Sequence, residues 1–162
     1  MPFSSVSLKL AADIVEIGTA RSLRLATAES CTGGLIGACL TEIPGSSVVV
    51  DRGFVVYSNR AKQELLGVPS NILETHGAVS AETAAAMATG ARDRAGVDMA
   101  IAVTGIAGPG GGSEAKPVGL VHLALAAEGR LDARRKIFPG DRQAVRAATL
   151  ELALRMVFAA LG

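Results

Sequence analysis

The stretch TAESCTGG, residues 27–34, brings an acid, hydroxyls, a thiol and two glycines together where an apolar run gives way to a helical pattern. Ser30 at such a junction could act as a nucleophile if a base accepts its proton, because a helix N-terminus stabilises negative charge. The same position suits a serine that only caps the helix. Cys31 is a rival nucleophile, but a thiolate needs a neighbouring cation to lower its pKa. Its apolar surroundings favour a buried structural thiol, and position alone leaves the role of Ser30 open.

Lys62 is the candidate base, because a lysine that is partly desolvated in a cleft can lose its proton near neutral pH. Tyr57, the one tyrosine of the chain, lies five residues earlier and could relay or hold a proton. The spacing fits neither Tyr-x-x-x-Lys nor, counted from Ser58, Ser-x-x-Lys, so Lys62 could equally be a surface residue. His76, expected in a loop, and His122, expected to pack within a strand, give no basis for a Ser-His-Asp triad.

A glycine-rich loop, residues 104–112, and two arginines are candidate anion-binding features. The loop cannot be regular structure, and its many unhindered N–H groups could surround an anion or a developing oxyanion. The G-x-G-x-x-A pattern that begins at Gly110 leads into a strand rather than opening a helix, so it does not indicate a dinucleotide site. Arg142 and Arg146 lie in the first turns of the last expected helix, where they could hold a phosphate or be solvated side chains.

Composition and charge exclude several classes of protein. The chain has 162 residues, 49% of them hydrophobic, which is enough for one substantial core, so we expect one domain over residues 1–162. The formal charge is +1, from 16 basic and 15 acidic residues, which argues against a nucleic-acid partner. Nothing resembles a signal peptide or a membrane span, so we expect a cytoplasmic protein without membrane contact. Cys31 and Cys39 would lie about 12 Å apart on one helix, too far for a disulfide, and metal-ligand spacing is absent.

Hydrophobic periodicity predicts that the chain begins with a helix, a strand and a second helix. The helical pattern through Leu10 and Ile14 should end at Gly18. A strand at residues 23–27 should follow, and the Ser30 turn should lead from it into the second helix. This arrangement would place Ser30 at the junction of a strand and a helix.

The middle of the chain contains a second strand region and two helices. The strand region covers residues 48–50 and 54–57, with Gly53 as a possible bulge between them. Asn59 should cap a short helix, and Ser80 should cap a long alanine-rich one. The short helix should run through Leu65 and Leu66.

The last part of the chain completes the pattern with strands at residues 99–103, 118–126 and 134–138, and with a final helix capped by Asp141. Strands that alternate with helices, several of them apolar throughout, predict an α/β sheet with helices on both faces. Ligands of such sheets bind at the loops beyond the C-terminal ends of strands. The loops richest in Gly, Ser and Thr all follow apolar strands.

Taken together, the motifs resemble those of one known family, the C-terminal domain of CinA, the competence/damage-inducible protein. They occur in its order and spacing, from about residue 5 to the end of the chain. The motifs are TAESCTGG at 27–34, PGSS at 44–47, YSNRAK at 57–62, HGAVS at 76–80, AVTGIAGPGGG at 102–112, KPVG at 116–119 and PGDR at 139–142.

That family is known as nicotinamide-nucleotide amidohydrolase, also called PncC or NMN deamidase. It converts nicotinamide mononucleotide (NMN) and water to nicotinic acid mononucleotide and ammonia. The resemblance implies this reaction for the present chain, with NMN as ligand, no cofactor, and a homodimer or larger homo-oligomer. It implies a three-layer α/β/α fold with a mixed, mostly parallel five-stranded sheet. Many members carry a molybdopterin-binding-like domain before this one; residues 1–162 do not match it, so we do not expect its pyrophosphatase activity.

The resemblance also implies roles for individual residues. Ser30 matches the serine of the amidase site, Lys62 and Tyr57 match the proton-handling pair, and Ser47 could supply a further hydroxyl. The choice of nucleophile among Ser30, Cys31 and Ser47 stays open.

The substrate would be held by the two loops and the last helix. Backbone N–H groups of residues 31–33, or of the Thr104 turn, would hold the oxyanion, and Arg142 would suit the phosphate. The implied substrate-binding residues are Thr32, Gly33, Thr104, Gly105, Gly108, Gly110 and Arg142. The alternative from another class is a non-catalytic nucleotide-binding or competence/DNA-damage-associated module.

Overall fold

The computed structural model describes residues 3–162. Helices and strands alternate along the chain for most of its length, as the periodicity predicts. In order they are α1 (Ser5–Ala20), β1 (Leu25–Glu29), α2 (Leu35–Thr41), the 3-10 helix η1 (Ser46–Val48), β2 (Val50–Val55), α3 (Asn59–Leu66), α4 (Ser70–His76), α5 (Ala81–Ala95), β3 (Met99–Gly105), β4 (Leu120–Ala127), β5 (Arg130–Ile137) and α6 (Arg142–Leu161).

The strands form one mixed five-stranded sheet in the order β2-β1-β3-β4-β5. Strand β1 pairs in parallel with both β2 and β3, whereas β3–β4 and β4–β5 are antiparallel. Four strands therefore run in one direction and only β4 runs against them. Because the chain moves from β1 outward to β2 and then back across β1 to β3, the order reverses between β1 and β3, which is where sheets of this type bind ligands.

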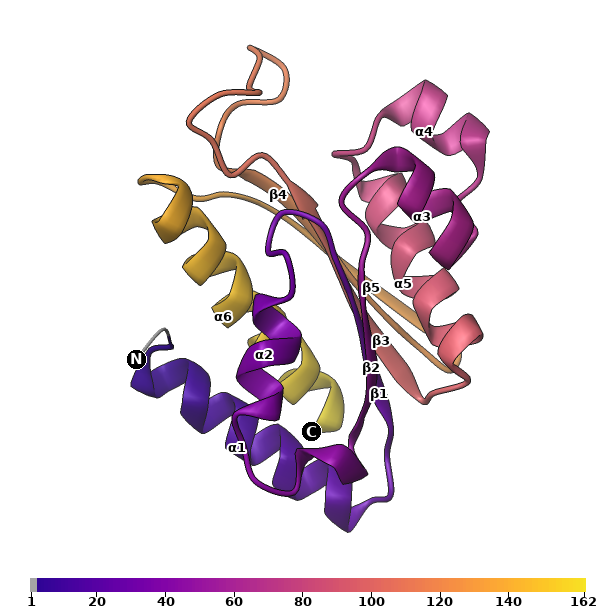
Figure 1. The fold of residues 1–162 in the computed structure, drawn as a ribbon, viewed down its shortest axis with the longest axis vertical. Helices are drawn as coiled ribbons and strands as arrows, with labels where there is room; N and C mark the ends of the chain where they lie inside the picture. Colours follow the sequence, from indigo (N-terminus) through magenta and orange to yellow (C-terminus); the bar gives the residue numbers. More distant parts are fainter. Residues whose placement is uncertain (1–2) are drawn as a thin grey trace.

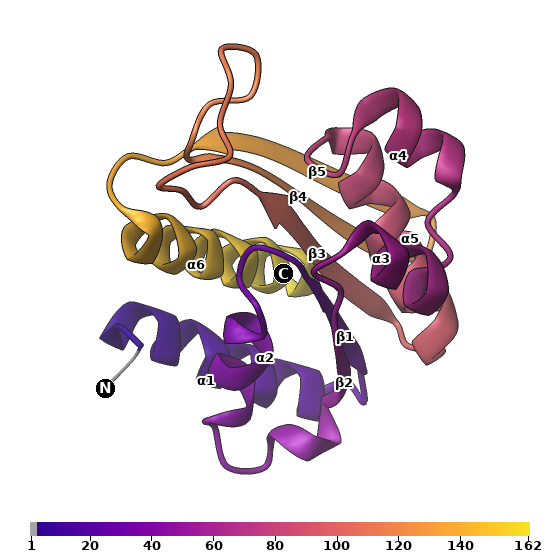
Figure 2. The same cartoon turned by 45° about the horizontal axis from the view of Figure 1, so that its top comes forward.

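Helices cover both faces of the sheet (Figures 1 and 2). Helices α1, α2 and α6 pack together on one face, and α3, α4 and α5 lie on the other, with α5 directly against β3 and β4. The fold is therefore the three-layer α/β/α arrangement with a mixed sheet that the resemblance implies. The loop that follows β3 rises to the top of the view in Figure 1, and the turn that follows β1 lies below it, joined to β3 by the hydrogen bond from the Ser30 N–H to the Val103 carbonyl oxygen.

The central strands carry large side chains on one face and alanines on the other. Successive strand residues point to opposite faces, so an apolar run divides into two separate cores. Toward α1, α2 and α6 the strands place Leu25, Ile101, Val103, Leu123 and Leu125. Toward α5 they place Ala26, Ala28, Ala100, Ala102, Ala124 and Ala126. The alanine face leaves room for α5 to pack closely against the sheet.

Gly90 in α5 fixes the position of α3, the helix that carries Lys62. A Cβ atom at Gly90 would lie 1.9 Å from the carbonyl oxygen of Leu66, the last residue of α3. Only a glycine permits this approach. The alanine face, α5 and Gly90 thus set how near α3 comes to the sheet.

Several predicted helix boundaries are wrong for local reasons. Helix α1 continues through Gly18 to Ala20, because the missing side chain makes room for Val49, whose Cγ1 lies 2.8 Å from the place of a Cβ. Ser58, not Asn59, caps α3, since its hydroxyl accepts the N–H of Ala61. His76 is the last residue of helix α4, not a loop residue. The caps expected at Ser80 and Asp141 are confirmed.

The strands also differ in extent from the predicted ones. Strand β1 lies two residues later, at Leu25–Glu29, so that Glu29 is part of it. Strand β2 is continuous over Val50–Val55, with its irregularity next to Val50 and not at Gly53. Thr104 and Gly105 belong to β3 rather than to an irregular loop. Ladder hydrogen bonds to neighbouring strands explain these extensions, because they do not depend on apolar side chains.

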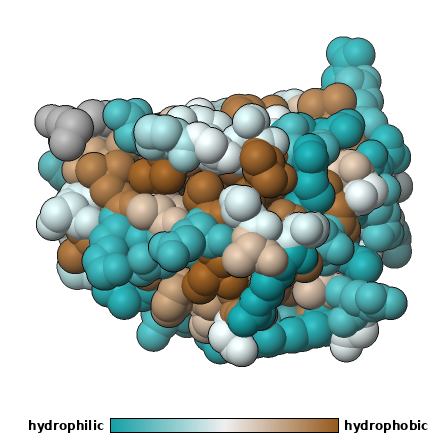
Figure 3. Space-filling model, turned by 90° about the horizontal axis from the view of Figure 1, so that it is seen from below, coloured by the Kyte–Doolittle hydropathy of each residue, from teal (hydrophilic) through white to brown (hydrophobic). Residues whose placement is uncertain are grey.

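The surface opposite the β1 and β3 loops carries small groups of apolar residues between polar ones (Figure 3). Within residues 3–162, no helix has both the length and the apolar character that a membrane crossing would require.

Candidate active site

Ser30 lies at the point where the strand order reverses. It directly follows the last residue of β1, and its N–H donates to the carbonyl oxygen of Val103 in β3 at 3.1 Å. The turn from residue 31 to Gly34 then leads into α2. The sequence-based expectation that Ser30 sits between a strand and a helix is correct in the structure.

Lys62 contacts Ser30 across 32 residues of sequence. Its Nζ lies 3.2 Å from Ser30 Oγ, 3.0 Å from the carbonyl oxygen of Val56 and 3.3 Å from that of Tyr57. Only 1% of the lysine is exposed, which is unusual for a residue type that normally keeps its amine in water. The sequence leaves open that Lys62 is a surface residue, because its spacing from Tyr57 and Ser58 fits no known dyad. The structure shows that it is buried.

The partners of the Lys62 amine determine what it can do. Carbonyl oxygens only accept hydrogen bonds, so a neutral amine would donate its two protons to Val56 and Tyr57. Its lone pair then faces the Ser30 hydroxyl, the one neighbour that can donate a proton. Burial lowers the pKa of Lys62, since removing an ammonium from water disfavours the charged form. The geometry suits a general base acting on Ser30.

Cys31 points into the apolar core beside α2 and is 5% exposed. Burial raises the pKa of its thiol to about 11, so the thiol stays protonated at neutral pH. Both Cys31 and Cys39 are free and buried. Among the three residues considered as nucleophile, Ser30 is the one in contact with a base.

Glu29 organises the turn that follows Ser30, a role that reasoning from the sequence missed. Its buried carboxylate accepts four hydrogen bonds, from Thr32 Oγ1 and from the N–H groups of Gly34, Ile36 and Gly37, at 2.6 to 3.1 Å. It thereby caps the N-terminus of α2, which has no cap from its own N-cap residue. The available signal was an acidic residue that ends an apolar strand just before a Gly-Gly pair.

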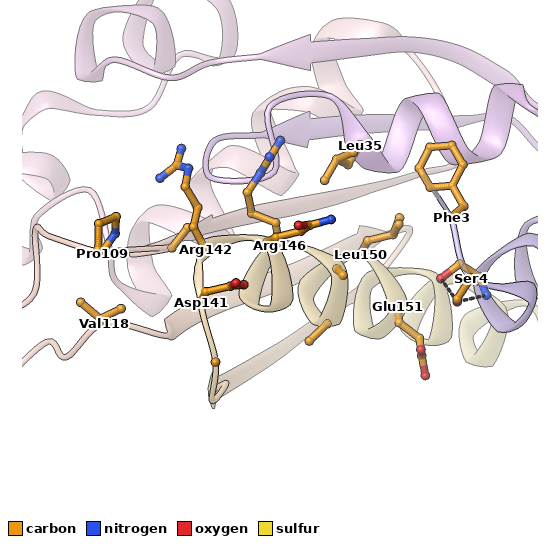
Figure 4. A pocket seen from close by; sticks show the side chains of 16 residues that line it. Phe3, Ser4, Leu35, Pro109, Val118, Asp141, Arg142, Arg146, Leu150 and Glu151 are labelled. Atoms are coloured by element: carbon orange, nitrogen blue, oxygen red, sulfur yellow. Dashed lines mark hydrogen bonds between the residues drawn. The ribbon is translucent and has the colours of Figure 1, made fainter. Parts of the chain in front are cut away.

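Arg146 in α6 binds the same turn from the other side. Its Nε donates to the carbonyl oxygen of Cys31 at 3.2 Å, and its Nη2 donates to that of Thr32 at 2.9 Å. Figure 4 shows Arg146 and Arg142 extending from α6 on the same side of the helix. Arg146 is thus occupied by the turn rather than free for a phosphate.

The hydroxyl of Tyr57 is directed to Arg142 and not to Lys62. Arg142 donates to this hydroxyl at 3.0 Å and to the carbonyl oxygen of Gly108 at 3.0 Å. Only the main-chain carbonyl of Tyr57 reaches Lys62. The expected pairing of the Tyr57 hydroxyl with Lys62 is absent, and Arg142 instead joins α6 to the loops after β2 and β3.

A cavity of about 940 Å³ adjoins Arg142 and the glycine-rich loop (Figure 4). Pro109 and Val118 border it at one end, and Phe3 and Leu35 at the other. Its volume falls within the range of about 300–1,000 Å³ that small-molecule sites occupy. The guanidinium groups and the apolar walls make it a mixed surface.

The remaining predicted substrate-binding residues lie in the turn after Ser30, at the end of β3 and in the glycine-rich loop. Thr104 lies beside the site, with its hydroxyl bound to the carbonyl oxygen of Ala78 at 2.7 Å, and Gly105 ends β3 next to it. Thr32 and Gly33 form the turn after Ser30. Gly108 accepts the hydrogen bond from Arg142, whereas no atom lies within 4 Å of a Cβ placed on Gly110.

Ser47 is not brought to Ser30. It is exposed in η1, just before the N-terminal end of β2, whereas Ser30 follows the C-terminal end of β1. Because β1 and β2 are parallel, these positions lie at opposite ends of the strands, about 16 Å apart for five residues. Its inclusion in this site is not supported by the geometry.

Fold and site together define a class: an α/β/α protein with a buried serine–lysine pair at the switch point of its sheet. Comparison with known proteins gives the family. Residues 7–161 match the model of the CinA C-terminal domain. The chain belongs to that family.

Individual relatives agree with this assignment. A CinA-like protein of Geotalea daltonii is 57% identical over 130 residues, which are 80% of this chain and 32% of the relative. The crystal structure of the competence/damage inducible protein CihA from Agrobacterium tumefaciens is 51% identical with a TM-score of 0.95, covering 97% of this chain and 96% of that one. A competence or damage-inducible protein from Enterobacter asburiae is 37% identical with a TM-score of 0.93, covering 98% and 99%. The chain spans about a third of the length of the curated relatives it matches.

Proposed function

We propose that this chain is an amidohydrolase that converts NMN and water to nicotinic acid mononucleotide and ammonia. The observation that carries the proposal is the contact of 3.2 Å between the buried amine of Lys62 and the hydroxyl of Ser30. Lys62 has no carboxylate partner within 4 Å among the described residues, so an ion pair does not explain its burial, which supports a role as a base.

The first half of the reaction acylates the enzyme. Ser30 Oγ attacks the carboxamide carbon while its proton moves to Lys62 Nζ, which leaves a tetrahedral oxyanion. The C–N bond then breaks, and Lys62 returns the proton to the departing nitrogen, so that ammonia leaves. The product of this half is an ester between Ser30 and the pyridine carboxyl group.

Water completes the reaction by the same route. Lys62 accepts a proton from water as its oxygen attacks the ester carbon, and the proton passes to Ser30 Oγ when the C–O bond to the serine breaks. One amide and one water give one carboxylic acid and one ammonia, and Ser30 and Lys62 are restored. General-base catalysis of this kind contributes about 10²- to 10⁴-fold.

Recognition of a mononucleotide is supported by Arg142, which binds the hydroxyl of Tyr57, the residue whose main-chain carbonyl binds Lys62. The cavity beside Arg142 is lined by neither Ser30 nor Lys62. Arg142 and the glycine-rich loop meet beside the cavity, and a phosphate would replace Gly108 and Tyr57 as acceptors of the guanidinium. Bidentate binding of phosphate by arginine is a strong interaction. Membership of the CinA C-terminal domain family supports the choice of NMN.

The test is incubation of the purified chain with NMN while ammonia and the acid product are measured. Ser30→Ala is the inactive comparison. Arg155→Ala is the matched control, because Arg155 is exposed on α6 and, among residues 3–162, pairs only with Glu151. Nicotinamide and its riboside serve as substrates that lack the phosphate. The proposal is wrong if NMN turnover by the unchanged chain does not exceed that of Ser30→Ala.

A further inference from the structure

The turn after Ser30 leaves two backbone donors unused. From Ser30 to Gly37, the N–H groups of Ser30, Gly33 and Leu35 donate to carbonyl oxygens. Those of Gly34, Ile36 and Gly37 donate to Glu29. In this described segment, only the N–H groups of Cys31 and Thr32 have no acceptor in another residue; the Cys31 N–H faces only its own thiol.

These two free donors belong to peptide groups whose carbonyls are both engaged. The Ser30 carbonyl, in the peptide that carries the Cys31 N–H, accepts the N–H of Gly33 at 3.1 Å. The Cys31 carbonyl, in the peptide that carries the Thr32 N–H, accepts Arg146 Nε. A hydrogen bond to a carbonyl polarises the N–H of the same peptide group, so both donors are strengthened.

We propose that the N–H groups of Cys31 and Thr32 form the oxyanion hole of Ser30, and that Arg146 is the residue that positions it. This inference rests on the proposed function in using Ser30 as the nucleophile. Arg146 does not touch the reacting atoms. Its two hydrogen bonds hold successive carbonyls of the turn on the side of α6, which keeps the N–H of Thr32 directed away from α6.

The charge of Arg146 supports this role. Its guanidinium has no carboxylate within 4 Å among residues 3–162, in contrast to the exposed arginines that pair with Asp or Glu. The positive charge of Arg146 behind the turn favours a developing oxyanion in front of it and opposes the negative charge that Glu29 brings to the same turn. Glu29 completes the arrangement by fixing Thr32 Oγ1 and the start of α2.

The test uses Arg146→Ala and Arg146→Lys, with Arg155→Ala as the control on the same helix. For Arg146→Ala we expect kcat for NMN to fall about 100-fold, as displacement of a reacting geometry does, with KM within about twofold. Arg146→Lys should retain part of the activity, and methylguanidinium added to Arg146→Ala should restore part of it. If Arg146 only stabilised the fold, we would expect neither a fall in kcat at nearly constant KM nor recovery of activity by methylguanidinium.

A second reaction separates this inference from the choice of substrate. A fluorophosphonate forms a bond from Ser30 Oγ to phosphorus, fluoride leaves, and the serine proton passes to Lys62. The phosphoryl oxygen of the adduct then occupies the oxyanion position. We expect Ser30 to be labelled about 100-fold more slowly in Arg146→Ala, in keeping with the same displacement, and the amide protons of Cys31 and Thr32 to move downfield in the labelled unchanged chain.

The outcomes are distinct. Labelling that is slowed by Arg146→Ala while the unchanged chain leaves NMN intact supports the oxyanion hole and contradicts NMN as substrate. Equal labelling of folded Arg146→Ala and the unchanged chain, or unshifted amide protons at Cys31 and Thr32, overturns the inference. Absence of any label on Ser30 overturns it as well. The amide measurement needs no substitution, so it decides the matter even where Arg146→Ala does not fold.

Discussion

Replacement of Glu29 by Gln should lower the free energy of unfolding, because this carboxylate holds the turn after Ser30 and the start of α2. One oxygen of Glu29 accepts three hydrogen bonds and the other accepts the N–H of Gly37. In the Glu29→Gln variant the amide oxygen can still accept the hydrogen bonds from Thr32, Gly34 and Ile36. The side-chain NH₂ group then faces the N–H of Gly37, and because both groups are donors that hydrogen bond is lost. Loss of one charge-assisted bond costs about 1.5–3 kcal/mol. The three remaining bonds become neutral and weaken by about 1 kcal/mol each.

The expected loss is about 4.5–6 kcal/mol, which is a large part of the roughly 5–15 kcal/mol by which proteins of this kind are stable. Urea denaturation followed by circular dichroism measures it. Glu16→Gln, at an exposed position of α1, is the control and should change the free energy of unfolding by less than about 0.5 kcal/mol. A loss below about 1 kcal/mol in Glu29→Gln would refute the idea that its four hydrogen bonds hold the turn together.

Three further changes test the base, the thiol and the helix packing. Lys62→Met should lower kcat about 10²- to 10⁴-fold. In the unchanged chain, kcat/KM should fall as the pH drops through the pKa of Lys62, because protonation removes the base. Burial lowers this pKa below the ordinary lysine value. If kcat/KM instead fell at about pH 10.4, the ordinary pKa of a lysine, the result would contradict this prediction. Cys31→Ala should keep NMN turnover within about threefold and Cys31 should resist iodoacetamide at pH 7, since its pKa is about 11; inactivation by the reagent at Cys31 would show a reactive thiol. Gly90→Ala should both destabilise the protein and reduce turnover, because a Cβ would meet the Leu66 carbonyl at 1.9 Å and displace α3; a thermal melt and an NMN assay within error of the unchanged chain would contradict that.

The layers of the fold could be predicted from the sequence because apolar periodicity reflects burial directly. Ser80 and Asp141 were identifiable as caps from residue type and from the patterns they precede. The sequence predicts a strand at residues 134–138, whereas β5 covers Arg130–Ile137. Most of its side chains are exposed, and the backbone hydrogen bonds to β4 that form it cannot be read from the apolar pattern. The pattern predicts a helix end at Gly18 because glycine usually weakens helices, whereas here it makes room for Val49.

The site could be located from sequence but not assembled from it. Ser30 at the end of an apolar strand was visible as a candidate, yet nothing local indicates that Lys62 is buried against it. That contact depends on how closely α3 packs on the sheet through α5. The turn is held by Glu29 from the preceding strand and by Arg146, which lies 115 residues from Cys31. Contacts between residues so distant in sequence follow from topology, which residue spacing does not encode.

The identity of the acylated residue is the most direct test of the serine–lysine mechanism. The purified chain is mixed with NMN, quenched with acid within one turnover, digested, and analysed by mass spectrometry. We expect the pyridine carboxyl group of the mononucleotide to be esterified to Ser30, and the ester to be absent from Lys62→Met. Turnover of NMN with the label on Cys31 or Ser47, or with unchanged rate in Ser30→Ala, would contradict this mechanism.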